Sequence, residues 1–332
     1  MARKLSFALF LLAVGFGFAQ EAAPVKAPPG AAALVNNIPI LESAVQRSLE
    51  RIPPERRAAA RAELINHLID NMVVDQYLVQ QKIVADVAEV DKRQALMKEE
   101  IIKQGKDYAL MLAELKLGEV ELKEHIAAEV RWEKYIDSQA NEKALQETFE
   151  QNKEVFNGAS VRARHILLTV PPTDTVELEK ARVQLVGYKK QVEEKVSVEI
   201  AKLPPATDNL GKEKARVALL DETFAVIAKE KSTCPSKDQG GDVGWFSRDG
   251  VMVENFSRTA FGLLPYQLSE PVKTQFGYHL ILTTEKKPGK DIKYEDLKGE
   301  VKEYFAERMR ERLAEHVRKF SKVVIFPTPV GS

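Results

Sequence analysis

A glycine-rich stretch, residues 240–246, places the tightest restriction on how this chain can fold. It reads Gly-Gly-Asp-Val-Gly-Trp-Phe, and glycines spaced this closely indicate a backbone that turns sharply or approaches another segment. The aromatic pair at its end favours the start of a β-strand. The loop just before it, residues 232–236, contains Cys234, the single cysteine of the chain. We therefore expect a turn that brings Cys234 next to side chains lying across a sheet.

The composition is that of a soluble protein with room for two modest domains. Of its 332 residues, 30% are charged and 44% are hydrophobic, and 49 Lys and Arg residues balance 49 Asp and Glu residues. No basic run interleaves with aromatic residues, so we expect no nucleic-acid partner. A single cysteine cannot form a disulfide within the chain, so stability must come from packing.

The N-terminal residues differ in kind from the rest. Basic residues precede an apolar run over residues 5–18, and the small residues Gly17 and Ala19 lie at its end, as a signal peptidase requires. We predict a signal peptide over residues 1–19 and a linker over residues 20–30. A retained membrane anchor is the alternative, but the run is shorter than the roughly 20 residues that span a bilayer. We expect export to the periplasm or cell envelope, or secretion, with no stable membrane span after cleavage.

Residues 31–157 are expected to be mainly helical, after a small hairpin or strand-turn at Asn36 and Asn37. Apolar residues then recur at steps of three and four, as on one face of a helix. His67 and His125 lack the spacing of metal ligands, and we expect no metal or cofactor. We predict a helix that begins near Glu42, a long helix from Pro54 through Leu78, helices over residues 88–103, 108–117 and 120–137, and a last helix that begins after a cap at Asn141 and ends near Asn152.

At Val161 the apolar pattern changes from helical to alternating, which indicates a strand over residues 161–168. Residues 195–221 are expected to be irregular, because the pairs Pro204-Pro205 and Asp208-Asn209 interrupt them. The order of elements, strand, helix, helix, strand, helix, strand, predicts a compact α+β module. The other expected elements are helices over residues 177–192, 222–231 and 254–262, a strand that begins at the aromatic pair 245–246, and a strand over residues 279–284.

Several motifs, in this order along the chain, resemble the parvulin-type peptidyl-prolyl cis–trans isomerases. The resemblance covers residues 160–287, and the flanking regions resemble the exported foldases of the SurA and PrsA type, whose helical part binds unfolded clients. Two departures stand out: Tyr266 replaces a glycine usual in its turn, and residues 169–174 lack the basic cluster of the phosphoserine-proline-specific branch. The motifs are residues 163–168 (Ala-Arg-His-Ile-Leu-Leu), 240–246, Phe256 with Ala260-Phe261, and 269–279 (Ser-Glu-Pro-Val-Lys-Thr-Gln-Phe-Gly-Tyr-His).

The resemblance implies a site at the centre of the sheet. His165 and His279 lie back to back and share a hydrogen bond, with Cys234 near the substrate carbonyl; a purely structural role for the histidines stays open. Cys234 could act as a nucleophile, but rotation about the imide bond breaks no covalent bond, so we favour a polar, hydrogen-bonding role. The residues implied to bind the proline substrate are Val243, Met252, Phe256, Thr274 and Phe276.

The C-terminal residues 294–320 form one apolar stripe at helical spacing, followed by a strand-like run at residues 323–326. A stripe this long needs a partner earlier in the chain, so we expect this segment to return to the N-terminal helices; a coiled-coil dimer is the alternative. The fold class is multidomain α and α+β: a SurA-like helical domain over residues 31–157, completed by residues 289–332, with a parvulin domain (FKBP-like α+β) inserted over residues 158–288.

The resulting expectation is an exported peptidyl-prolyl cis–trans isomerase and chaperone for secreted or outer-membrane proteins. Its partners would be unfolded or nascent polypeptides with X-Pro bonds, and the sequence leaves a monomer or a dimer open. One alternative is a pure holdase chaperone with an inactive parvulin module. Another is a structural envelope component that uses the fold for interaction alone.

Overall fold

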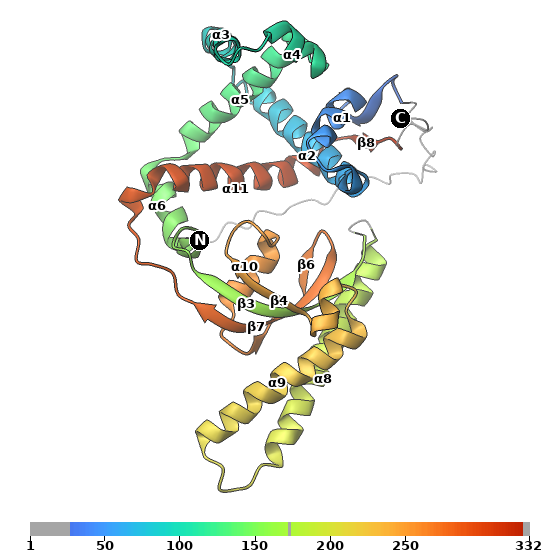
Figure 1. Ribbon diagram of the computed structural model, residues 1–332, viewed down its shortest axis with the longest axis vertical. Coiled ribbons are helices and arrows are strands. Elements are labelled where there is room, and N and C mark those ends of the chain that lie inside the picture. Colours follow the sequence, from blue (N-terminus) through green and yellow to red (C-terminus); the bar gives the residue numbers. More distant parts are fainter. Residues whose placement is uncertain (1–26, 172–173, 328–332) are drawn as a thin grey trace, which may run out of the picture. The chain divides into compact units, whose positions relative to one another are not determined.

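A computed structural model describes residues 27–171 and 174–327 of the chain. The predicted signal peptide, residues 1–19, lies outside the described residues. The chain divides into two compact units. The helical unit comprises residues 1–139 and 306–332, and the sheet unit comprises residues 140–305 (Figure 1). The expected combination of a helical part and an α+β part is confirmed.

The helices of the helical unit follow the apolar periodicity of the sequence. Two of them begin at an aspartate whose carboxylate accepts a backbone N–H of the first turn, Asp86 from Ala88 (2.9 Å) and Asp107 from Leu110 (2.9 Å). These caps satisfy backbone donors that the helix itself leaves unpaired. The predicted helices are confirmed as α1 Glu42–Glu50, α2 Pro54–Gln80, α3 Val87–Lys103, α4 Tyr108–Glu114 and α5 Glu119–Gln139.

A small sheet in the helical unit joins the two ends of the described chain. Its strand order is β2-β1-β8, with β1 Ala31–Val35, β2 Ile38–Leu41 and β8 Val323–Ile325. The predicted turn at Asn36 and Asn37 is confirmed, and both residues have positive φ angles of 51° and 69°, which asparagine tolerates better than most residues. The Asn36 side chain also accepts the backbone N–H of Lys322 at 2.8 Å.

The C-terminal helix α11, Lys298–Arg318, enters the helical unit at Ala306. There Arg318 pairs with Asp70 at 2.8 Å, and the Arg310 guanidinium lies 4.4 Å from the centroid of the Trp132 ring. The functional domain limits proposed from the sequence, 157/158 and 288/289, remain a prediction. Among the described residues, no helix is both long and apolar enough to cross a membrane.

The sheet unit is built on an antiparallel sheet with the path β4-β3-β7-β5, and β6 also pairs with β7. The long central pair matches His165 with Ile281 and Leu167 with His279 across the strands. Neither β5 nor β6 was expected from the sequence, because each is too short to show alternation. The strands are β3 Ser160–Thr169, β4 Asp242–Ser247, β5 Gln267–Leu268, β6 Val272–Thr274 and β7 Gly277–Lys287.

The prediction that residues 195–221 are irregular is wrong. They form the adjoining ends of two long helices, α8 Thr175–Ala201 and α9 Asn209–Lys231, which run side by side (Figure 1). Pro204 and Pro205 lie in the short connection, and Asp208 caps α9 by accepting the N–H of Gly211 at 2.7 Å. Pro204, Pro205 and Asp208 therefore mark the short connection between the two helices and not a long loop, because proline and aspartate suit a helix boundary.

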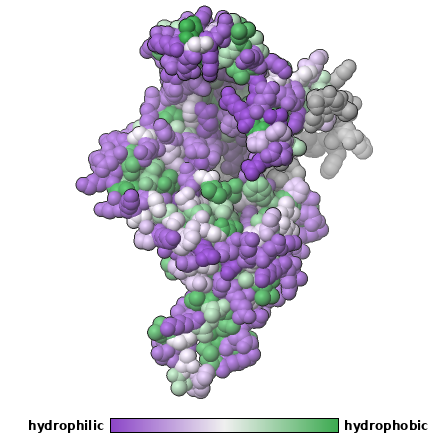
Figure 2. Space-filling model, in the orientation of Figure 1, coloured by the Kyte–Doolittle hydropathy of each residue, from purple (hydrophilic) through white to green (hydrophobic). Residues whose placement is uncertain are grey.

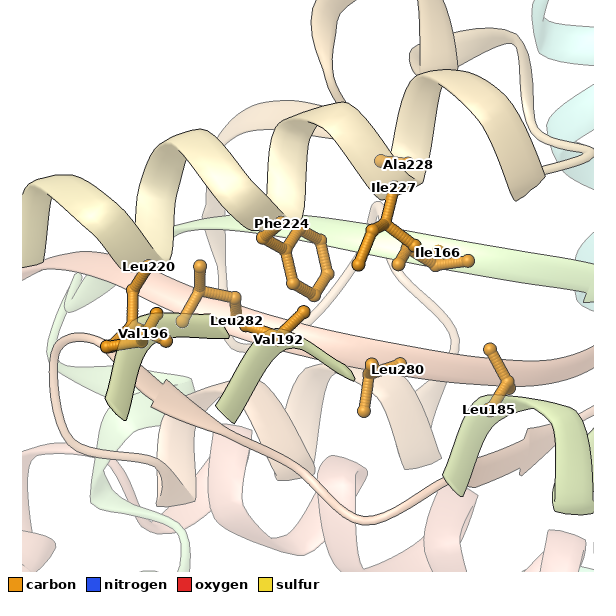
Figure 3. Packing of buried hydrophobic residues seen from close by; sticks show 10 residues of the cluster. All are labelled: Ile166, Leu185, Val192, Val196, Leu220, Phe224, Ile227, Ala228, Leu280 and Leu282. Atoms are coloured by element: carbon orange, nitrogen blue, oxygen red, sulfur yellow. The ribbon is translucent and has the colours of Figure 1, made fainter. Parts of the chain in front are cut away.

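The sheet separates two apolar cores. On one face, α8 and α9 pack on β3 and β7, with Phe224 and Val192 between them (Figure 3). On the other face, α10 contributes Phe256 and Phe261, which pack against Val161 of β3. The strand alternation predicted from Val161 onward is thus confirmed, and it puts the side chain of His165 on the α10 face. The remaining helices are α6 Glu142–Gln151, α7 Lys153–Phe156, α10 Glu254–Gly262 and the 3-10 turns η1 Pro235–Gln239 and η2 Tyr294–Asp296.

Candidate functional site

Two buried histidines meet at the centre of the sheet. His165 of β3 and His279 of β7 are 6% and 4% exposed. Their Nδ1 atoms are 3.1 Å apart, and their rings are stacked with centroids 5.3 Å apart. The register of β3 against β7 produces this contact. His279 lies opposite Leu167, and Leu167 is two residues after His165, so the two histidines lie on the same face of the sheet. The two histidines that the resemblance implied are brought together.

The pair belongs to a chain of four hydrogen-bonding side chains. His165 Nε2 lies 3.0 Å from Ser236 Oγ, and His279 Nε2 lies 2.8 Å from Thr274 Oγ1. Thr274 Oγ1 also accepts the backbone N–H of Phe276 at 3.1 Å. We assign the direction in which Thr274 donates to His279, His279 donates to His165, and His165 donates to Ser236. In this direction every ring nitrogen is paired and the Ser236 hydroxyl keeps its own hydrogen for a ligand.

Both imidazoles are held in their neutral form. Burial lowers the pKa of His165 to about 4. Burial, together with the neighbouring His165, lowers the pKa of His279 to about 3. A low-dielectric setting disfavours the imidazolium form, so near neutral pH the site contains no charged histidine. The site is therefore suited to a neutral amide and not to an acid–base reaction that needs a charged imidazole.

The glycine-rich stretch fits closely against His165. Gly240 and Gly241 have positive φ angles of 67° and 79°, and a Cβ on Gly241 would lie 2.3 Å from the carbonyl oxygen of His165. The N–H of His165 donates to the Gly241 carbonyl at 2.9 Å. The Arg164 side chain also donates to the Gln239 carbonyl at 2.9 Å. The expected sharp turn is present, and only glycine allows this approach.

The loop that contains Cys234 is attached to β3 through Ser232 and Thr233. Buried Ser232 accepts the N–H groups of Leu167 (3.1 Å) and Cys234 (3.3 Å) through its hydroxyl oxygen. The Thr233 backbone N–H donates to the Leu167 carbonyl at 2.8 Å, and the Thr233 hydroxyl accepts the N–H of Thr169 at 3.0 Å. Side-chain and backbone bonds together hold this loop beside the histidine strand.

Cys234 itself is half-buried. Within the described part of the chain, its sulfur makes no hydrogen bond to either histidine. A nucleophilic thiol needs a base or a positive charge that stabilises the thiolate, and neutral, mutually bonded histidines supply neither. The arrangement favours the polar role over the nucleophilic one.

The residues implied to bind proline occupy different environments. Phe256 is 2% exposed, and its ring meets both histidine rings edge to face at 5.4 Å. It can form a floor but has little free surface. Val243 and Met252 are partly buried against the same core, whereas Phe276 is 44% exposed in the turn after Thr274. The structure thus places Phe256 and Thr274 in contact with the histidines, places Val243 and Met252 on the core that Phe256 joins, and leaves Phe276 at the surface.

Sequence reasoning missed two parts of this site. Ser236 was seen only as a loop residue, and Ser232 was given no role. A second serine two residues after Cys234 was a weak signal, because serine is common in any loop. The bond from His165 to Ser236 connects residues 71 positions apart, so only the folded chain reveals it.

Comparisons with known proteins find similar sequences among foldases and peptidyl-prolyl isomerases. A family model described as a rotamase, PPIC-type PPIase domain matches residues 197–285. Foldase protein PrsA of Bacillus subtilis is 44% identical over 104 residues, which are 30% of this chain and 34% of that protein. Foldase protein PrsA of Caldanaerobacter subterraneus is 26% identical over 350 residues, covering 98% of this chain and 97% of that protein.

A third relative is a putative peptidyl-prolyl cis-trans isomerase of Campylobacter jejuni. It is 30% identical over 230 residues, which are 68% of this chain and 66% of that protein. The matched part is thus about a third of the Bacillus subtilis protein and about two thirds of the Campylobacter protein. The family predicted from the sequence motifs is confirmed. Through its sheet unit, the chain belongs to the parvulin-type peptidyl-prolyl cis–trans isomerases.

Proposed function

We propose that this protein is an exported peptidyl-prolyl cis–trans isomerase that also acts as a chaperone for unfolded exported polypeptides. The neutral pair of His165 and His279 is the observation that supports the isomerase function best. Rotation about an X-Pro bond has a barrier of roughly 18–20 kcal/mol, because the C–N bond has partial double-bond character. A dry, uncharged site that binds the twisted imide more tightly than either planar form lowers this barrier without a covalent step.

In this proposal each group has a separate task. Val243 and Met252 hold the proline ring by apolar contact, above Phe256. Ser236 can donate its hydroxyl hydrogen to a substrate carbonyl, because His165 donates to its oxygen. Cys234 contributes a polar rim, and Thr274 fixes the tautomer of His279. Phe276, which is exposed, would close over the substrate from the turn.

A protease-coupled isomerisation assay with proline-containing peptides tests the activity. The wild type should accelerate the cis–trans change, and Met252→Ala should lower kcat/KM about tenfold, which corresponds to about 1.4 kcal/mol of lost transition-state stabilisation. Phe256→Ala is less informative, because removing a core phenylalanine costs about 3–5 kcal/mol of stability. An inactive wild type would refute the isomerase function and leave the holdase alternative.

Substitution of Cys234 distinguishes the polar role from the nucleophilic one. Cys234→Ala should reduce kcat/KM by less than about tenfold, since only one polar contact is lost. A nucleophilic thiol predicts a loss of roughly a thousandfold or more, as for other covalent catalysts. Thermal unfolding of the variant serves as the control for its fold.

For the chaperone activity we propose an apolar groove in the helical unit as the place where clients bind. The groove, of about 520 Å³, lies between the end of α2, α3 and α5. Three of its charged residues form ion pairs, Asp91 with Lys123 at 2.7 Å and Arg131 with Asp75 at 2.7 Å, and Glu124 also lines the groove. Open aliphatic surface with paired charges suits unfolded segments of varied sequence. Its valines are Val79, Val84, Val87, Val90 and Val120.

A further inference from the structure

The loop between β4 and α10, residues 248–253, contains Met252 and is open to solvent over much of its length. Val251 within it is 78% exposed, and Gly250 has a positive φ angle of 107°. Such a loop has little packing of its own, so its position depends on how its two ends are held. The residues at those ends are Arg248 and Glu254.

Arg248 and Glu254 form a bidentate ion pair across the base of this loop. Arg248 Nη1 and Nη2 donate to the two carboxylate oxygens of Glu254 at 2.7 and 2.8 Å. The Arg248 side chain is only 5% exposed. Its carbonyl accepts the hydroxyl hydrogen of buried Ser257, one turn into α10. Two independent contacts therefore fix the start of the loop to the first turns of α10.

A second arginine, Arg258, also donates to Glu254, at 2.6 and 2.9 Å. Its side chain is largely exposed. Burial by itself would raise the pKa of Glu254, but the bonds from Arg248 and Arg258 outweigh this and lower it to about 2. The carboxylate is thus charged at any physiological pH, and the pair cannot be released by a modest acidification.

Stability by itself does not account for this arrangement. The cost of removing two charges from water often cancels their attraction, so a buried ion pair tends to be no more stable than apolar residues of the same size. What such a pair provides is defined geometry, because a bidentate guanidinium–carboxylate pair fixes both the distance and the orientation of the two side chains. A fixed orientation matters here because the loop that it closes holds a residue of the proposed proline site.

We propose that Arg248 and Glu254 are positioning residues that set where Met252 stands against the proline ring of the substrate. This inference rests on the proposed isomerase function. The pair touches no substrate; it acts by holding both ends of a six-residue loop in which residues 249–251 are exposed. Loss of the pair should therefore weaken substrate binding more than it slows the bound reaction.

The test uses the full chain with Glu254→Gln and Arg248→Met, and Arg258→Met as the matched control. In the isomerisation assay, the first two variants should raise KM about five- to tenfold with kcat changed less than about twofold. Arg258→Met, which leaves the bidentate pair intact, should stay within about twofold of the wild type in both constants. Glu254→Gln is the milder change and keeps the test available if Arg248→Met does not fold.

A second readout does not depend on activity. With ¹³C-methyl methionine labelling, the Met252 resonance, assigned through Met252→Leu, should shift or broaden in Glu254→Gln and stay in place in Arg258→Met. An unmoved Met252 resonance with an unchanged KM in a folded Glu254→Gln variant would overturn the proposal. An inactive wild type would instead refute the proposed function, and the methyl resonance would then decide the positioning role by itself.

Discussion

His165 and His279 lie in the sheet unit with almost all of their surface buried, whereas the groove of the helical unit is lined by valines such as Val87, which is 72% exposed. The histidine site is polar and buried, and it is fixed by four directed hydrogen-bonding contacts. The groove is aliphatic and open to solvent, and Asp91, Lys123 and Arg131 in its lining form ion pairs. One site depends on atomic geometry, and the other depends on accessible apolar area.

This difference separates two kinds of recognition within one chain. A site that must favour one twisted imide needs preorganised groups, and any displacement is costly. A surface that holds many unfolded segments needs area without directional bonds, because directional groups would select a single sequence. Substitutions should therefore reduce stability and activity strongly at the histidine site, and should leave stability almost unchanged at the groove.

The largest expected effect is the response of the sheet unit to acid. Unfolded histidines have a pKa near 6.5, and burial lowers it to about 4 for His165 and about 3 for His279. The stability from burying neutral rings is fully present above pH 6.5 and is lost as the pH falls toward these values. Each pH unit in this window removes up to about 1.4 kcal/mol per histidine. Denaturant unfolding from pH 7 to pH 4 measures the decline.

Histidine ring resonances provide the check on this acid response. The Cε1–H signals of His165 and His279 should stay constant from pH 8 down to about pH 5. A midpoint near 6.5 for either ring would show that the pair is not held neutral. The site could then no longer be contrasted with the groove as a buried, uncharged one.

Gly241→Ala should strongly destabilise the sheet unit. The new Cβ would lie 2.3 Å from the His165 carbonyl oxygen, at a φ of 79°, and we expect a loss of about 2–4 kcal/mol of unfolding free energy. Gly244→Ala is the matched control, because its φ is also positive, 71°, but nothing lies within 4 Å. It should cost about 1 kcal/mol. Equal losses in chemical denaturation would argue against tight packing at His165.

Thr274→Val tests the hydrogen-bonding chain and keeps the side-chain shape. It removes the partner of both His279 Nε2 and the Phe276 N–H, which should cost about 1–3 kcal/mol of stability. We also expect kcat/KM to fall about tenfold, since the tautomer of His279 is no longer fixed. Thr259→Val removes only a local bond to the Asn255 carbonyl within α10, and its kcat/KM should stay within about twofold of the wild type.

The smallest effect on stability is expected in the groove. Val87→Ser with Val120→Ser should change the unfolding free energy by less than about 0.5 kcal/mol per site. It should nevertheless lower suppression of client aggregation several-fold, because the apolar area is lost. Isomerase activity on short peptides should not change.

The control for the groove lies on the hairpin of α8 and α9, where apolar surface is also visible (Figure 2). Val183 and Val198 on α8 are exposed there. The same pair of serine substitutions at these positions should leave aggregation suppression intact. If both double variants lose suppression equally, client binding follows total apolar surface and not the groove.

The sequence by itself determined the elements that depend on neighbouring residues. Apolar spacing predicted α2, α3 and α5, and the alternation from Val161 onward predicted β3 with His165 on the same face as Val161 and Ala163. The glycine-rich turn was predictable because consecutive glycines permit conformations that other residues resist. The motifs around His165 and His279 predicted the family that the comparisons confirm.

Only the tertiary structure decided which distant groups meet. The bond between His165 and His279 joins residues 114 positions apart, and it depends on the register of β3 against β7. The lowered pKa values follow from burial on both sides of the pair, which local composition does not encode. The hairpin of α8 and α9 was missed for a related reason: Pro204 and Pro205 disrupt the local pattern, but packing of Phe224 and Val192 across the two helices outweighs it. Local propensity is a weak preference that burial of apolar surface overrides.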